Sequence, residues 1–96
     1  MAADGLLGID HVEQVSDTEV TCVVRCLRGT VSVGDVIRTG RTAANAVVAL
    51  EATVHAMWRY GRPVEFVDTV HTAKVMFTGA GARALAECRE VATGVL

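Results

Sequence analysis

The sequence predicts an all-β fold: a small, closed, antiparallel barrel of six or seven strands, Greek-key-like, with at most a short helical turn. Two observations predict it. Short runs rich in β-branched residues alternate between apolar and polar positions, and turn signals separate these runs at regular spacing. Closure removes the exposed edges that a small open sheet carries, and it therefore favours a barrel.

Length and composition indicate one domain spanning residues 1–96, because no linker, charge run or internal repeat divides the chain. Hydrophobic residues make up 51% of the chain and only four residues are aromatic, so we expect a core of Val, Ala, Leu and Ile. The net charge of −2 gives no overall attraction for nucleic acid, which would need a local basic patch. No apolar run approaches the roughly 20 residues that cross a bilayer. The N-terminus lacks the features of a secretory signal, so we expect a cytoplasmic protein without membrane contact.

The clearest strand is "EVTCVVRCL", residues 19–27. Alternation places the charged Arg25 on one face and four apolar residues on the other. The four, which we predict to point into the barrel, are Val20, Cys22, Val24 and Cys26. Two of the three cysteines, Cys22 and Cys26, lie about 13 Å apart along a strand, too far to form a disulfide. We therefore expect free thiols in a reducing compartment.

The middle of the chain is harder to assign. We expect a turn and then a short strand through Val36 and Ile37, which ends at Gly40. Residues 41–46 predict a loop or short turn, and residues 51–58 predict a strand, although the alanines of this region also suit a helix. One face of that strand is expected to carry Ala52, Val54, Ala56 and Trp58.

The second half returns to clear signals. "YGRP", residues 60–63, predicts a turn. Strands are expected at residues 64–67 and 71–77, followed by a helical turn from Ala82 to Glu87. The segment 89–96 predicts a closing strand.

Several motifs occur in the order and spacing of a known family. "TEVTCVVRCLRGTVSVGDVI" follows the pattern "GTVVTGRVxRGxIKVGDEV", and "ATVHAMWRYGRPVEFV" follows "xxVRSIxxHGKPVEEA". From about Leu7 to Val91, the chain resembles the second domain of translational GTPases, the β-barrel of elongation factor Tu, initiation factor 2 and the selenocysteine-specific elongation factor. The positions that match in these two motifs are Arg25, Arg28, Gly29, Val33, Gly34, Asp35, Val54, Gly61, Pro63, Val64 and Glu65.

The resemblance implies that "RGTVSVGD", residues 28–35, is the hairpin connection at which the long strand reverses. Glycines there would supply backbone angles that other residues adopt only with strain. We prefer this interpretation to a loop that binds phosphate. The turn residues expected along the chain are Gly29, Gly34, Gly61, Pro63 and Gly79.

The chain departs from the family at positions that carry its function. In elongation factor Tu, the barrel helps to hold the aminoacyl end of tRNA. Thr78 stands where that protein has an arginine, and the acidic pair of the family's opening motif falls on Asp10 and His11. Val70 replaces a glycine that many relatives have. We therefore do not expect specific binding of aminoacyl-tRNA.

The residues indicate no catalytic, metal or cofactor site. No "GxxxxGK[ST]" loop occurs, so we expect neither binding nor hydrolysis of nucleotides. His11, His55 and His71 lack the spacing of paired metal ligands, and the simpler interpretation is solvent-facing or hydrogen-bonded histidine. A Cys–His nucleophile would need a histidine brought close by the fold and a lowered thiol pKa. We therefore expect no enzymatic activity.

Two functional hypotheses remain. In the first, a stand-alone, non-catalytic barrel binds RNA or a ribonucleoprotein through arginine–phosphate contacts and base stacking. The residues proposed for this role are Arg25, Arg28, Arg59, Tyr60 and Arg62. The alternative for these arginines, and for Arg38 and Arg41, is a scattered, solvent-facing distribution.

In the second hypothesis, a protein-interaction or regulatory module keeps the barrel without RNA binding, and its partner is another protein or a second copy of itself. Trp58, Tyr60 and Phe66 would then form an apolar partner surface. Arginines gathered on one face would favour RNA, whereas arginines dispersed around an exposed aromatic residue would favour a protein partner.

Overall fold

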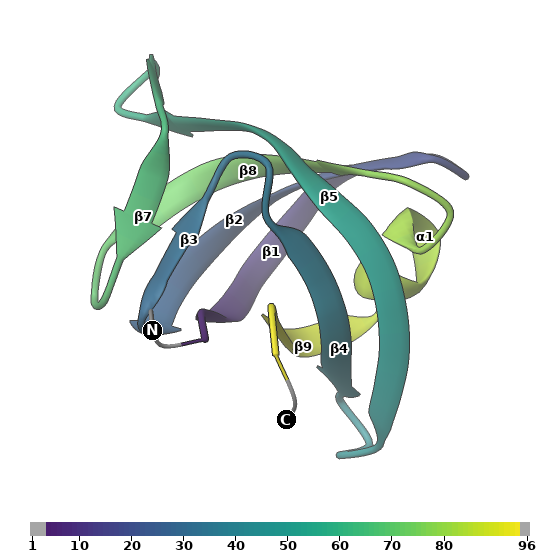
Figure 1. Ribbon diagram of the computed structural model, residues 1–96. Coiled ribbons are helices and arrows are strands. Elements are labelled where there is room, and N and C mark those ends of the chain that lie inside the picture. The colour runs from purple at the N-terminus through teal and green to yellow at the C-terminus, as the bar shows by residue number, and fades with distance from the viewer. Residues whose placement is uncertain (1–3, 95–96) are drawn as a thin grey trace.

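The computed structural model, which describes residues 4–94, is a closed antiparallel β-barrel (Figure 1). Six strands follow one another around it in the order β4-β9-β1-β2-β8-β5, and β5 pairs back with β4 to close it. Their bounds are β1 Leu6–Val15, β2 Glu19–Arg28, β4 Val36–Thr42, β5 Val47–Arg59, β8 Thr72–Thr78 and β9 Cys88–Ala92. The predicted fold class is confirmed.

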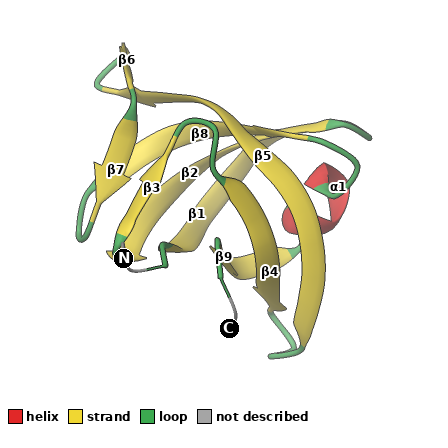
Figure 2. Cartoon of the chain, viewed as in Figure 1, coloured by secondary structure: helices red, strands yellow, loops and turns green. Residues whose placement is uncertain are grey.

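Three short strands and one helical turn complete the described chain. β6 (Arg62–Val64) pairs with β5 outside the barrel, while β3 (Thr30–Ser32) and β7 (Phe66–Asp68) form a separate two-stranded sheet. Figure 2 shows these strands gathered on the side of the barrel away from α1 (Ala82–Leu85). Within residues 4–94, no helix is long and apolar enough to cross a membrane.

The inward face of β2 is the one predicted from alternation. All four predicted core residues, Val20, Cys22, Val24 and Cys26, are fully buried. Arg25 points to the opposite, exposed face. Burial raises the pKa of the Cys22 thiol to about 12 and also raises the pKa of Cys26, because a thiolate is poorly solvated inside the barrel.

A bulge in β5 changes which of its faces is buried. The pairing with β8 passes from Val54 opposite Phe77 to Ala56 opposite Met76, so His55 is an extra residue. Because side chains alternate along a strand, one extra residue turns all later side chains over. Met57 is therefore buried, and Trp58 lies on the outer face. The predicted single face of Ala52, Val54, Ala56 and Trp58 is wrong beyond Val54 for this reason.

Gly40 does not end its strand as expected. β4 continues to Thr42, and Gly40 pairs with β5 on one side and β9 on the other. A Cβ atom at this position would lie 2.5 Å from Cys88 Sγ and 2.8 Å from Leu50 Cδ1. The glycine is thus required by close packing inside the sheet and does not mark a turn.

The connection at residues 28–35 is not a simple hairpin either. β2 pairs with β1 and β8, whereas the next strand, β3, pairs with β7. Gly29 has a φ of 68° and lies where β2 ends and β3 leaves for the second sheet. Gly34 has a φ of 97° in the turn before β4, which the amide of Asp35 closes by donating to the carbonyl of Ser32 at 3.0 Å.

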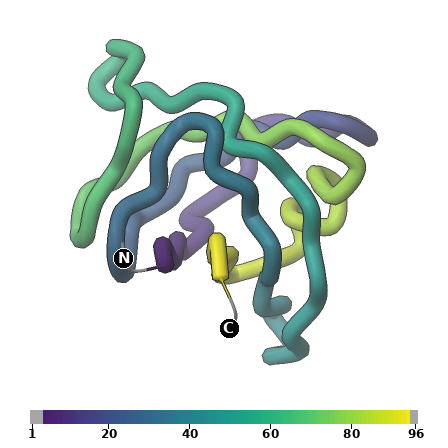
Figure 3. Tube along the Cα trace, in the orientation of Figure 1, coloured from purple at the N-terminus to yellow at the C-terminus, as the bar shows by residue number. Residues whose placement is uncertain are grey.

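The two ends of the described chain lie side by side. β1 and β9 pair from Leu6 opposite Ala92 onward. The amide of Gly5 donates to Oγ1 of Thr93 at 2.9 Å, and the amide of Thr93 donates to the carbonyl of Gly5 at 3.0 Å. The trace in Figure 3 shows this juxtaposition at the foot of the barrel.

We predict that a thiol reagent at pH 8 labels Cys22 and Cys26 only after unfolding. Both side chains are fully buried, and their raised pKa values keep them as thiols at that pH. Mass spectrometry of the native protein over time measures the labelling, with the urea-unfolded protein as the control. Rapid native labelling of both thiols would contradict inward packing.

Candidate functional site

A groove of about 950 Å³ crosses the outer face of the barrel. Residues of β2 and β8 form its floor. β1 borders one side, and the β5–β6 hairpin together with the β7–β8 turn borders the other. The volume lies within the range of about 300–1,000 Å³ that is usual for sites that bind small ligands.

The register of three strands fixes the floor of the groove. Val23 of β2 lies opposite Lys74 of β8, and Lys74 lies opposite Trp58 of β5. Side chains directly opposite one another on antiparallel strands share a face and lie about 4.5–5.5 Å apart at Cβ. An apolar residue, a cation and an indole therefore stand in one row across the groove.

The β5–β6 hairpin carries the most exposed aromatic side chain of the described chain. Arg59 pairs with Arg62, which leaves Tyr60 and Gly61 as a two-residue turn with φ values of 53° and 76°. Two positive φ angles are what a type I′ hairpin turn requires. The turn holds the Tyr60 ring 94% exposed at the rim of the groove.

Arg59 has an unmet hydrogen-bonding requirement. Its guanidinium Cζ lies 5.7 Å from the centroid of the Tyr60 ring, a cation–π arrangement. Its Nε is buried and has no hydrogen-bond partner among residues 4–94. A buried donor left unpaired costs about 1–3 kcal/mol. Other atoms of Arg59 line the groove, so its side chain brings positive charge to this surface.

An ion pair crosses the opposite end of the groove. Lys74 Nζ lies 2.9 Å from Glu13 Oε1, and His11 Nε2 lies 3.6 Å from Glu13 Oε2. The hydrogen bond from the Lys74 ammonium is the main cause that holds the pKa of Glu13 below its usual value. Glu13 thereby offsets part of the positive charge on the groove floor.

The β7–β8 turn forms the remaining wall. The amide of His71 donates to the carbonyl of Asp68 at 3.1 Å, and the Asp68 carboxylate lies 2.7 Å from His71 Nδ1. Val70, between them, has a φ of 67° and is 64% exposed. The resemblance to translational GTPases places Val70 where many of those proteins have glycine. The left-handed backbone explains why glycine suits it.

The groove brings together only some of the residues that the sequence predicted to bind RNA. Arg59 and Tyr60 line it, and Arg62 lies directly across the hairpin from Arg59. Arg25 pairs with Thr72 beside the groove, whereas Arg28 lies opposite Leu6 at the far end of β2.

The predicted turn residues are spread along the chain. Gly61 belongs to the hairpin turn, and three glycines with positive φ lie elsewhere: Gly29, Gly34 and Gly79. Pro63 is not in a turn but in β6, opposite Trp58.

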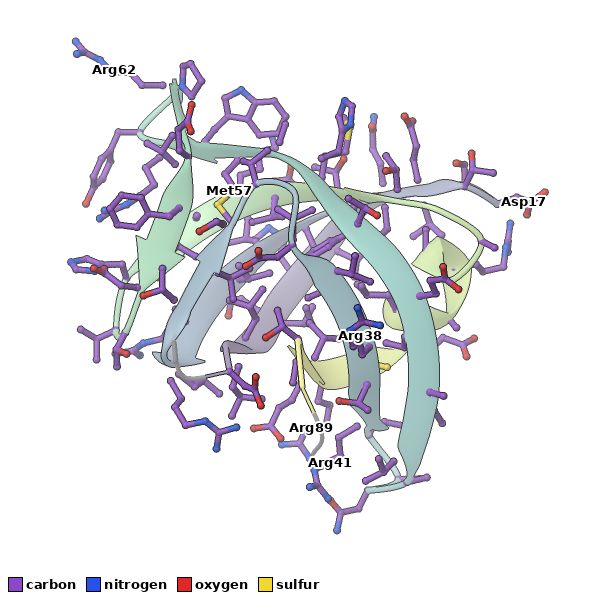
Figure 4. All side chains as sticks on the ribbon, in the orientation of Figure 1. Asp17, Arg38, Arg41, Met57, Arg62 and Arg89 are labelled. Atoms are coloured by element: carbon purple, nitrogen blue, oxygen red, sulfur yellow. The ribbon has the colours of Figure 1, made fainter. Side chains whose placement is uncertain are left out.

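The other arginines are not part of this surface. Figure 4 shows Arg41 and Arg89 at the end of the molecule opposite Arg62, whereas Arg38, in β4, lies between the two ends. Arg41 Nε lies 3.5 Å from Glu90 Oε1 there. The arginines thus form no continuous basic face, and the charge of the groove comes from a few residues.

Sequence reasoning missed several groove residues. Lys74 stands between two inward-facing residues, Ala73 and Val75, so its outward direction was visible in the alternation. Its position beside Trp58 depends on strand register, which the sequence does not show. Glu13 lies at an irregularity in the pairing of β1 with β2, which no local signal indicates. Within residues 4–94, no group of three His, Cys, Asp or Glu side chains could hold a metal ion.

Comparison with solved structures supports the family resemblance at the level of fold. The chain is similar to translation elongation factor SelB from Methanococcus maripaludis in its apo form, with 13% identity, a TM-score of 0.69, and coverage of 94% of this chain and 19% of that one. The β-barrel fold of this chain is thus similar to a segment of that translation factor. The chain is also similar to GDP-bound aIF5B from Aeropyrum pernix, with 18% identity, the same TM-score of 0.69, and coverage of 100% of this chain and 15% of that one.

The chain spans less than a fifth of the length of either translation factor. No protein-family profile and no curated protein sequence matches it. At these identities the likeness establishes the barrel architecture and leaves the ligand to be argued from the groove.

We predict that Lys74→Met raises the pKa of Glu13 towards its usual value, whereas Lys74→Arg leaves it low. The folded-state pKa of Glu13 is lowered, so its contribution to stability is present above the unfolded pKa and is lost as pH falls through the folded pKa. An NMR titration of the Glu13 carboxyl carbon measures the change. An unchanged pKa in Lys74→Met would show that the ion pair does not persist in solution.

Proposed function

We propose that this domain is a non-catalytic binding module that takes single-stranded RNA into the groove between β1 and the β5–β6 hairpin. The observation that carries the proposal is the combination, in one groove, of aromatic side chains with cations. The half-buried Trp58 and the exposed Tyr60 supply the rings, and Arg59 and Lys74 supply the cations.

The chemistry of single-stranded RNA matches this combination. Unpaired bases stack on aromatic side chains, each stack contributing about 1–3 kcal/mol, while arginine and lysine contact the phosphates between them. Arg62 lies across the hairpin from Arg59, and Lys74 lies on the groove floor beside Trp58. The cations therefore stand next to the stacking surfaces, as successive phosphates and bases require.

The electrostatics argue for weak, salt-sensitive binding. The chain has a net charge of −2, and Glu13 offsets part of the charge on Lys74. A long polyanion would meet few cations around the groove, because Arg41 and Arg89 lie at the far end of the molecule and Arg38 does not line the groove. We therefore infer a short contact of a few nucleotides.

We predict that Arg59→Ala combined with Arg62→Ala weakens RNA binding and flattens its salt dependence, by about 0.7 in the log–log slope for each phosphate that the protein no longer neutralises. The matched control is Arg38→Ala combined with Arg89→Ala, which removes the same charge from two positions outside the groove (Figure 4). Fluorescence anisotropy with a labelled single-stranded RNA, at several salt concentrations, measures both quantities. Equal weakening in both double variants would show that net charge, and not the groove, governs binding.

The proposal does not extend to recognition of the aminoacyl group. Thr78 stands where elongation factor Tu has an arginine, and His11 stands at one position of its acidic pair. Charged and uncharged tRNA should therefore bind alike. A clear preference for the aminoacylated form would count against the groove as the site.

We further propose that this chain carries out no nucleotide chemistry, because it contains no phosphate-binding "GxxxxGK[ST]" loop. The similar translation factor solved with GDP shares only a segment of its length with this chain. Incubation with GTP should release no phosphate above the level of a buffer blank. Stoichiometric GTP binding with turnover would refute this part of the proposal.

A second candidate function, protein interaction, is favoured by the dispersal of the arginines and by apolar exposure near the β3–β7 sheet. Phe66 is 53% exposed and pairs with Ser32, next to Val33, which is 40% exposed. Affinity capture from a lysate of the source cell, with and without ribonuclease, separates the two candidates. Release of the captured material on ribonuclease treatment supports RNA, and its persistence supports a protein partner.

A further inference from the structure

Two residues at the rim of the groove have a left-handed backbone conformation that suits neither side chain. Tyr60 has a φ of 53° and Val70 a φ of 67°. Bulky residues rarely adopt left-handed backbone, and a β-branched residue such as valine does so only under strain. The third non-glycine residue with positive φ in residues 4–94 is Asn45, whose short amide side chain tolerates this conformation.

The same two side chains are also the most exposed. Among large hydrophobic side chains of the described chain, Tyr60 at 94% and Val70 at 64% have the highest exposed fractions. Neither side chain is held in place by burial, and the backbone would be better served by glycine or asparagine. Folding therefore gains little from either residue.

The surrounding structure fixes both residues in these conformations. The amide of Val70 donates to the carbonyl of Cys26 at 2.8 Å, and the amide of Cys26 donates to the carbonyl of His71 at 2.9 Å. These bonds tie the β7–β8 turn to β2. The pairing of Arg59 with Arg62 closes the turn at Tyr60 in the same way. Strain that is held by its surroundings is typical of sites that contact a ligand.

Both residues line the same groove, although they come from different turns. We propose that Tyr60 and Val70 form a clamp that holds one nucleobase of a single-stranded RNA, by stacking on the tyrosine ring and by apolar contact with the valine. The inference rests on the function proposed above. The clamp goes beyond that function by naming the two residues that would select the flat, unsaturated ring of a base.

A base is favoured over an aliphatic peptide side chain by the charge beside the clamp. The Arg59 guanidinium lies over the Tyr60 ring, and both residues line the groove. A nucleotide presents an anionic phosphate next to its base, so one ligand unit satisfies both the ring and the cation. An aliphatic side chain would satisfy the apolar contact alone.

The test compares two clamp variants with a control of the same kind. Val70→Gly and Tyr60→Asn each put a residue suited to left-handed backbone at the rim, and Asn45→Gly makes a similar change in the β4–β5 turn, outside the groove. The probes are a single-stranded oligoadenylate of about ten nucleotides and an abasic ribose-phosphate oligomer of equal length. Anisotropy gives the affinities, and thermal unfolding gives the stability of each variant.

We expect Val70→Gly to leave the unfolding midpoint unchanged or raised, while weakening oligoadenylate binding about three- to tenfold. Tyr60→Asn should weaken it between about fivefold and a hundredfold, the range that base stacking gives. The salt dependence and the binding of the abasic oligomer should match those of the wild type in both variants. Asn45→Gly should bind both probes as the wild type does.

Three results would overturn the clamp alone: undiminished oligoadenylate binding in both clamp variants, equal binding of both probes by the wild type, or a parallel decrease of stability and affinity in Val70→Gly. The last would show that the valine is structural. If the wild-type protein binds neither probe at low salt, the proposed function fails and the clamp fails with it. Binding of an apolar peptide in place of RNA would also overturn the clamp, and would favour the protein-interaction function.

Discussion

A single extra residue, His55, controls which side chains of β5 meet the solvent. The bulge lets Ala52 and Val54 point into the barrel and then brings Met57 inward in place of Trp58. Trp58 consequently stands beside Lys74 on the outer face. The β5–β6 hairpin follows directly, so the groove wall takes its orientation from the same irregularity.

The barrel supplies a rigid support for the small surface at which we propose binding. The inward side chains of β2 are fully buried in the core, and its outer face forms part of the groove floor. β8 pairs with both β2 and β5, so the three strands that carry the floor and the hairpin are held in one register. Groups placed on such a scaffold need little reordering when a ligand binds, and this limits the entropic cost of association.

The groove combines features that folding alone does not favour. Arg59 keeps a buried donor unpaired, and Tyr60 and Val70 hold exposed apolar side chains on left-handed backbone. Each feature lowers stability in the free protein, and each lies at the same place on the surface. Their coincidence is the physical reason for proposing this groove as the binding site in preference to the arginines at the opposite end of the molecule.

The sequence by itself determined the barrel, the inward face of β2, the turn at Tyr60 and Gly61 and the helical turn near Ala82, because each depends on local alternation or on residues suited to turns. It also named Arg59 and Tyr60, which are neighbours along the chain. Only the tertiary structure decided that Trp58 and Lys74 share a face, that Gly40 lies inside a sheet, and that Val70 joins Tyr60 at one rim. These relations depend on a bulge and on the register between strands distant in sequence, which packing of the whole barrel sets and no short segment encodes.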